Sequence, residues 1–212
     1  MFKSRAAVAA LLPLSLVACS TDGQLTDSGI TVTRSACPAV AIPAATGDIT
    51  LFAPENARTA DAIDVVANIT NLRSTCGEAG DQITSNVTFD IHAQRRDTRG
   101  AREVVIPYVV TIVQGGTAVV SKAIGRVGLR FEDGQPRAST SATGTGQVAR
   151  AAASLPREVE EQITRRRKPG DPDAAIDPLA DPAVREAVRR ASFEVLVGFQ
   201  LTQEQLAYNA TR

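Results

Sequence analysis

The sequence predicts a mainly β protein, an immunoglobulin-like antiparallel β-sandwich with a helical insertion before its last strand. Three observations support this fold class. Apolar residues alternate with polar ones from about residue 38 to 150, turn-forming residues separate the alternating runs, and helix signals appear only after residue 150. A length of 212 residues is typical of a single domain. Because aromatic residues make up 4% of the chain and Trp is absent, we expect an aliphatic core, unlike the Trp-centred core of antibody domains.

Several runs before residue 132 have the two-residue period of a strand with one dry face. The clearest is Ile83–Arg96, where Val87, Phe89 and Ile91 alternate with polar residues. The other expected strands are Asp61–Leu72, Thr117–Phe131, the short run Asp48–Phe52 and a short edge within 38–43. In Thr117–Phe131 one face is expected to include Val119 and Ala123, together with Val127, Leu129 and Phe131.

The run 104–113 differs from the others because it is apolar and β-branched on both faces. We expect either a strand that is covered on both sides or a strand with one face at an interface. Pro107 cannot donate to a strand ladder, so an edge or a bulge is expected there. Gln114-Gly115-Gly116 then supplies a hairpin turn. After a second turn at 132–135, the polar, glycine-interrupted run Arg137–Val148 is a further candidate strand.

The helical insertion is expected over about residues 154–191. Pro156–Arg167 is typical of a helix with proline at an early position, where its missing N–H costs little. Asp181-Pro182 combines a capping side chain with an N1 proline and predicts a second helix through about Arg190. The alternating run 193–201 is the expected last strand.

The N-terminal segment has the parts of a secretory signal peptide. Lys3 and Arg5 form a basic head, and the apolar run 6–17 is shorter than the roughly 20 residues that a membrane-spanning helix needs. The segment Leu16-Val17-Ala18-Cys19 resembles the lipobox of bacterial lipoproteins. The alternative is an ordinary signal peptide with an incidental cysteine.

The resemblance implies that signal peptidase II removes residues 1–18 and that Cys19 carries a diacylglyceryl group, with a second acylation (palmitate-type) at the new amino terminus. Several acyl chains give stable membrane anchoring. Ser20, in place of Asp, implies the outer membrane, with the protein facing the periplasm. Residues 19–36, rich in Ser, Thr, Asp and Gly, are the expected flexible tether to a domain that spans 37–212.

Cys37 and Cys76 are the cysteines left over once Cys19 is acylated. Because the bacterial periplasm is oxidising, a disulfide between them is the simplest prediction. The alternative is a pair of metal-binding or redox thiols. Their spacing is not that of a CxxC motif, and no histidine lies near either one.

Candidate catalytic residues are few. His92 is the sole histidine and shares a strand face with Asp90, so the carboxylate could orient the imidazole. The alternative is a solvated surface pair, because no nucleophile or metal-ligand spacing accompanies them. The acidic pairs 132–133 and 160–161 are expected in a turn and on an exposed helix, not as acid/base partners. We therefore predict no catalytic residues, no metal site and no cofactor.

The strongest local charge is a run of basic residues: Arg165, Arg166, Arg167 and Lys168. The helix dipole favours cations at a helix C-terminus, and the alternative is contact with an anionic lipid surface. A second basic row, Lys122, Arg126 and Arg130, is expected to be the charged face of a strand. The formal net charge of zero argues against a nucleic-acid partner, whose phosphates attract basic surfaces.

These observations predict a lipid-anchored cell-envelope lipoprotein that is a non-catalytic binding or assembly module. Its expected partners are the membrane, through the N-terminal lipid anchor, and another envelope protein; no small-molecule substrate is identified. One alternative is a peptidoglycan or envelope-glycan binding module, although the absence of Trp leaves few side chains that stack on sugars. Another is a periplasmic hydrolase, which would need a pocket that joins His92 to a carboxylate and a hydroxyl.

Overall fold

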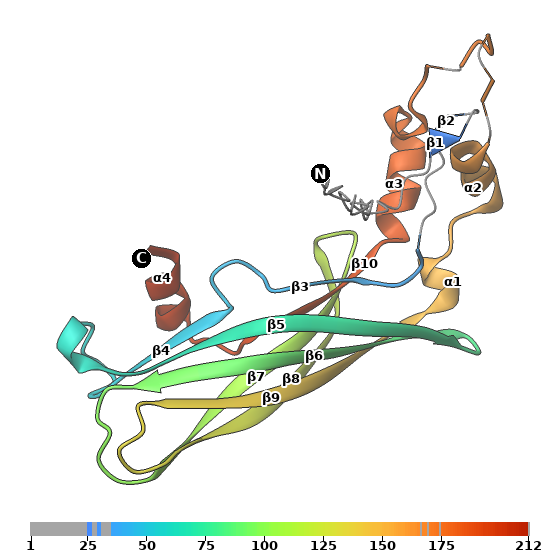
Figure 1. Ribbon diagram of the computed structural model, residues 1–212. Coiled ribbons are helices and arrows are strands. Elements are labelled where there is room, and N and C mark those ends of the chain that lie inside the picture. Colours follow the sequence, from blue (N-terminus) through green and yellow to red (C-terminus); the bar gives the residue numbers. More distant parts are fainter. Residues whose placement is uncertain are drawn as a thin grey trace, which may run out of the picture.

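The computed structural model describes residues 25–26, 29–30, 35–165, 167–168, 170–173 and 175–211. Two four-stranded sheets make up the body of the molecule, and helices lie between its last two strands in the chain order (Figure 1). A small antiparallel pair, β1 (Leu25–Thr26) and β2 (Gly29–Ile30), precedes the sheets within the segment expected to be a tether. The protein is therefore mainly β with a helical insertion, as the sequence predicts.

The first sheet has the strand order β3-β10-β7-β8. Its members are β3 (Ala39–Ala41), β10 (Phe193–Phe199), β7 (Arg102–Gln114) and β8 (Ala118–Phe131). β3 pairs in parallel with β10, and the other neighbours are antiparallel. The β7–β8 turn holds Gly115 at φ 62° and Gly116 at φ 77°. Glycine suits both positions because only it adopts these left-handed values without strain.

The second sheet has the order β4-β5-β6-β9, with antiparallel neighbours throughout. Its members are β4 (Asp48–Phe52), β5 (Ile63–Ala79), β6 (Gln82–Arg95) and β9 (Arg137–Ala149). β5 continues past Leu72, where its predicted counterpart ends. The pairing register with β6 shifts between Thr70 and Arg73, and the residues beyond the shift are exposed. The alternation that marks a strand is absent there because neither face is buried.

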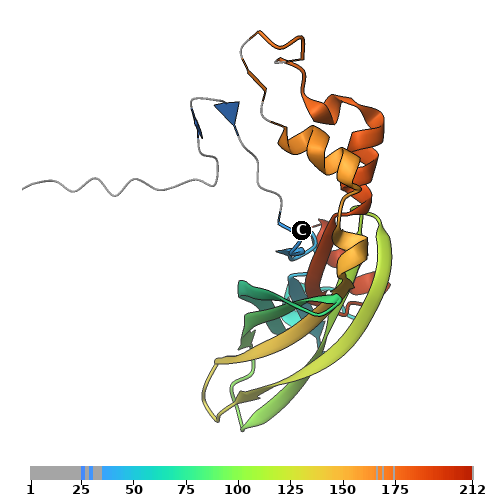
Figure 2. The same cartoon turned by 90° about the vertical axis from the view of Figure 1, so that its right-hand side faces the viewer.

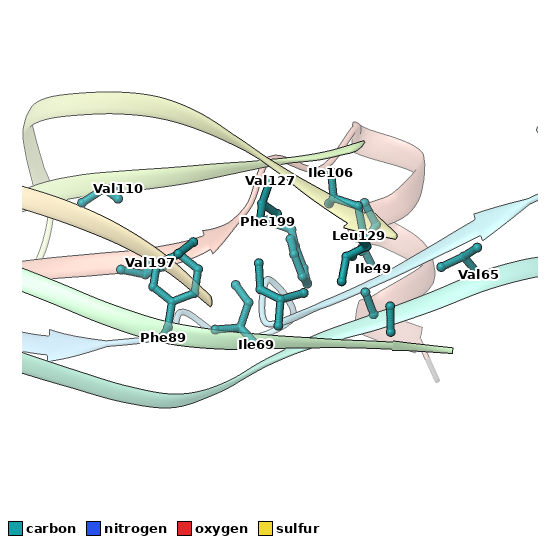
Figure 3. Packing of buried hydrophobic residues seen from close by; sticks show 14 of the residues in the cluster. Ile49, Val65, Ile69, Phe89, Ile106, Val110, Val127, Leu129, Val197 and Phe199 are labelled. Atoms are coloured by element: carbon teal, nitrogen blue, oxygen red, sulfur yellow. The ribbon is translucent and has the colours of Figure 1, made fainter. Parts of the chain in front are cut away.

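The core lies between the two sheets, and the predicted alternation is confirmed in the strands that line it. In β6 the buried aliphatic and aromatic residues lie at every second position, and β10 has the same pattern. Figure 3 shows Phe89 of β6 and Val197 and Phe199 of β10 among the buried residues of the core. β9 approaches the first sheet closely. A Cβ at Gly144 would lie 2.5 Å from Val110 Cγ2, and one at Gly146 would lie 2.8 Å from Val195 Cγ2. The glycines that weaken the strand pattern of this segment thus allow the sheets to pack together.

The strand order does not show the immunoglobulin-like topology that the sequence suggested. In immunoglobulin domains the last two strands are neighbours in one sheet. Here β9 is an edge strand of the second sheet, whereas β10 lies between β3 and β7 in the first. The sheets also curve, and together they enclose the core like one half of a barrel (Figure 2). Alternation reports which face of a strand is dry, but it does not report which strands pair.

A disulfide joins Cys37 to Cys76, with their Cα atoms 6.0 Å apart. This confirms the predicted pairing. The bond connects the beginning of the domain to the exposed far end of β5. Because it links residues separated by 39 positions, the chain-entropy model assigns it a stabilisation of about 4 kcal/mol.

The insertion between β9 and β10 contains α1 (Arg150–Ala153), α2 (Arg157–Thr164), the short 3₁₀ helix η2 (Pro178–Ala180) and α3 (Pro182–Arg190). The predicted cap is confirmed, since the Asp181 side chain accepts a hydrogen bond from the Ala183 N–H at 2.8 Å. α3 buries Val184 and Ala187, whereas α2 buries no residue. α2 also ends earlier than predicted, at Thr164.

The last helix, α4 (Gln203–Thr211), follows β10. It packs on β4, where the Tyr208 and Phe52 rings meet edge to face with centroids 5.2 Å apart. Asn209 Nδ2 donates to the backbone carbonyls of Ala45 and Asp48 at 2.9 and 2.7 Å. A second short 3₁₀ helix, η1 (Ala60–Ala62), leads into β5.

Candidate functional site

The predicted lipidation site, Cys19, and the whole predicted signal peptide lie outside the described residues, and so does Arg166. No helix within the described ranges is both long enough and apolar enough to cross a membrane. The remaining candidate residues are all placed by the structure.

His92 and Asp90 lie on the solvent side of β6, as the alternation predicts. Asp90 is held by other partners, because its carboxylate accepts hydrogen bonds from Ser141 Oγ at 2.7 Å and from Asn71 Nδ2 at 2.6 Å. These two bonds, Ser141 first, lower the pKa of Asp90, and the charges of His92 and Arg73 contribute less. Within the described part of the chain, the carboxylate makes no hydrogen bond that would orient the imidazole.

Both acidic pairs contain residues with structural partners. Glu132 accepts from Arg130 Nε at 2.7 Å, and the neighbouring Asp133 accepts from the Gly100 N–H at 2.6 Å. On α2, Glu161 lies 3.4 Å from Arg157 in an i,i+4 ion pair. Among the residues that the structure describes, no group of three or more His, Cys, Asp or Glu side chains could hold a metal ion.

The basic run after α2 is partly neutralised within the insertion. Arg165 and Arg167 both make ion pairs with Asp173, and the first of these bonds is the main cause that lowers the pKa of Asp173. The Arg167 side chain is only 17% exposed and also donates to the Gln162 carbonyl. Since α2 ends at Thr164, these cations lie beyond the helix and hold the following loop instead. Lys168 is exposed.

A pocket of about 350 Å³ lies between β4 and α4. Two of its lining residues, Arg58 and Glu204, form an ion pair at 2.8 Å, and the Arg58 guanidinium lies 4.8 Å from the Phe52 ring centroid. Thr50 and Asp64 are among its lining residues, whereas His92 is not. This pocket therefore does not assemble the set of groups that the hydrolase alternative requires.

The strand that is apolar on both faces, β7, gives the most distinctive surface. Ile106, Val110 and Ile112 are buried in the core, whereas Val105 on the opposite face is 56% exposed. The sequence left two alternatives for this strand. The structure leaves its outer face exposed at Glu103 and Val105 and half-buried from Pro107 to Thr111. Only Val113, near the end of β7, is buried on that side.

The outer surface continues onto β8. Ile124 is directly opposite Val109 in the ladder and is 62% exposed. Val119, opposite Val113, is 62% exposed, and Val120, which has no partner at the register shift, is 51% exposed. We call these five side chains the hairpin face: Val105, Val109, Val119, Val120 and Ile124.

The prediction for Val119 is wrong, because it was expected to share the inward face with Val127 and Leu129. The register shift in the β7–β8 ladder adds one residue to β8 and turns Val119 toward the outer side. Ala123 is exposed as well, although Val110 opposite it in the ladder is buried against β9. The two-face apolar character of β7 was the sequence signal for the surface, but nothing in the sequence located the bulge.

The second basic row borders the hairpin face. Arg130 is engaged by Glu132, and Glu103 is opposite it in the ladder. Lys122 and Arg126 are exposed on either side of Ile124, and neither makes an ion pair within the described residues. The surface thus combines exposed aliphatic side chains with two uncompensated cations.

Comparisons with protein-family models, with curated proteins and with solved structures found no match for this chain.

Proposed function

We propose that this protein is a lipid-anchored cell-envelope lipoprotein whose two-sheet domain is a non-catalytic module that binds another envelope protein. The observation that carries the proposal is the hairpin face. Single exposed aliphatic side chains are normal on protein surfaces, but several gathered on one face of two adjacent strands favour an interaction surface.

The rigidity of this surface supports a role in binding. Its side chains project from two long paired strands, and the opposite face of β7 is anchored in the core by Ile106, Val110 and Ile112. The turn is also held, since Gln114 Nε2 donates to the Arg190 carbonyl at 2.7 Å and the Gly115 N–H donates to the Ser192 carbonyl at 2.9 Å. A surface held in this way loses little conformational entropy when a partner binds.

The anchoring part of the proposal rests on the sequence. The segment Leu16-Val17-Ala18-Cys19 resembles a lipobox, and the disulfide between Cys37 and Cys76 is of the kind that oxidising compartments preserve. The slightly acidic mature chain, which loses Lys3 and Arg5 with the signal peptide, offers no overall attraction to anionic lipid. Attachment would therefore depend on the acyl chains.

The proposal is tested in membranes that contain the lipidated protein. A photo-crosslinking amino acid at position 124 should trap a discrete partner, whereas one at the exposed position 145 of β9, on the other sheet, should not. Cys19→Ala should abolish acyl labelling and membrane retention. Equal cross-linking at both positions would contradict a role for the hairpin face, and normal lipid labelling of the Cys19 variant would contradict the anchor.

A further inference from the structure

β8 is an edge strand with an open side. It pairs with β7 alone, and the first sheet ends there. Backbone N–H and C=O groups on the open side of an edge strand are free to pair with another chain. Every residue from Ala118 to Ile124 is exposed, so no described segment covers this part of the edge.

The edge has few of the features that protect natural edge strands from pairing. Protected edges are short, contain proline, carry lysine or inward-pointing charges, or are twisted away by a β-bulge. β8 has two of these features, Lys122 and the bulge at Val120, but the bulge precedes the stretch 122–126 and the cations of that stretch lie on the outer face. β8 has 14 residues and no proline, and its exposed half carries Val119, Val120 and Ile124. β9, the edge of the other sheet, is polar and rich in glycine by comparison. The hairpin face therefore adjoins a long aliphatic edge.

The charges along β8 select the partner. Lys122 and Arg126 lie on the same side of the strand, about 13 Å apart at the usual rise per residue, with Ile124 between them. Arg130, farther along the same row, already has Glu132 as its partner. A strand added to this edge would place side chains directly opposite Lys122, Ile124 and Arg126. Carboxylates opposite the two cations are favourable, whereas cations there are unfavourable.

We infer that β8 accepts an extended segment of the partner protein as a fifth strand of the first sheet, and that this segment carries acidic side chains opposite Lys122 and Arg126 and an aliphatic side chain opposite Ile124. This inference rests on the proposed function and specifies the chemistry of its partner. Main-chain hydrogen bonds supply affinity in such strand addition, and the alternating side chains supply specificity.

The test uses the purified full chain in detergent micelles and a fluorescent ten-residue probe of alternating Val and Thr with Glu at two positions four apart. A second probe has Lys at these positions. Fluorescence anisotropy should show the Glu probe binding at least tenfold more tightly than the Lys probe. In the double variant Lys122→Glu and Arg126→Glu the preference should reverse. Arg137→Glu on the edge strand of the other sheet is the matched control and should leave the preference unchanged.

Two further probes separate strand addition from other kinds of contact. A Glu probe with N-methyl groups on alternate residues keeps its charge but loses backbone donors, so it should bind at least tenfold more weakly. Equal binding of the methylated probe would overturn strand addition in favour of a simple charge contact. Phosphatidylglycerol vesicles that displace the Glu probe from wild type, and fail to bind the double variant, would assign the edge to a membrane surface instead.

The outcomes also distinguish this inference from the proposed function. If no probe distinguishes wild type from the double variant while position 124 still cross-links to one partner, strand addition is excluded and the binding role stands. If position 124 does not cross-link either, both fail together.

Discussion

Arg95 is the residue on which the loops at one end of the sheets converge. It is 2% exposed, and its guanidinium donates to the carbonyls of Gln135, Gly100, Thr98 and Glu132 at 2.7–2.9 Å. It also lies 5.3 Å from the Phe131 ring centroid. The alternation of β6 predicts that position 95 lies on the inward face. The sequence does not indicate that backbone carbonyls accept hydrogen bonds from the charged side chain at this position.

We predict that Arg95→Lys lowers the free energy of unfolding by about 2 kcal/mol or more. An ammonium has three donors at one point and cannot reproduce a planar fork that serves four carbonyls, and each buried acceptor left unpaired costs about 1–3 kcal/mol. Urea denaturation measures the loss. Arg137→Lys, at an exposed position, should change stability by less than about 0.5 kcal/mol. Equal stability of the two variants would show that water replaces the lost donors without cost.

Asp90 gives a second test at this scale, because its neighbours rank in a definite order. Ser141→Ala should raise the pKa of Asp90 toward its usual value more than Asn71→Ala does, and His92→Gln should raise it least. Since the pKa is lower in the folded protein, the stabilisation is present above the unfolded pKa and is lost as the pH falls through the folded value. Titration of the carboxyl ¹³C resonance measures these shifts. A larger shift from His92→Gln would revive the Asp–His pair as a functional unit.

At the scale of elements, the sequence predicts well where one face of a strand is dry. The positions of β6 and β10 were predicted for this reason. The cap of α3 was predicted because its Asp181-Pro182 signal is local. The failures lie where burial is absent or pairing intervenes. The outer half of β5 is exposed on both faces, and the bulge at Val120 depends on the register with β7. Neither property is a function of the local residues alone.

The hairpin face belongs to the same scale. The apolar composition of β7 on both faces indicated that a second layer covers it or that it meets a partner, and the choice between them needed the arrangement of the other elements. Among the described residues, the hydrogen bonds between this hairpin and the segment around α3 lie at its turn end. The uncovered surface is therefore a consequence of where the insertion packs, which no pattern within β7 reports.

The whole molecule divides its stability unequally between the sheets and the insertion. β10 comes after the insertion, yet it lies between two strands of the first sheet and contributes Val195, Val197 and Phe199 to the core. α2, by contrast, buries no residue. The order of elements in the chain thus differs from their order of importance for folding, because the final strand joins partners from the beginning and the middle of the sequence.

We predict that replacing residues 157–177 with a short Gly/Ser linker leaves cooperative unfolding intact, whereas deleting residues 192–212 abolishes it. The first change removes α2 and an exposed loop but keeps α3 and its buried residues, Val184 and Ala187. The second removes β10, in which loss of one buried Phe alone costs about 3–5 kcal/mol, against the 5–15 kcal/mol that typically stabilise a whole domain. Thermal unfolding followed by circular dichroism compares the two chains. Because the hairpin face and the β8 edge lie on the sheets, the chain with the Gly/Ser linker should also keep its cross-link at position 124. Loss of folding in that chain would show that the insertion stabilises the sheets through contacts other than the burial of α2.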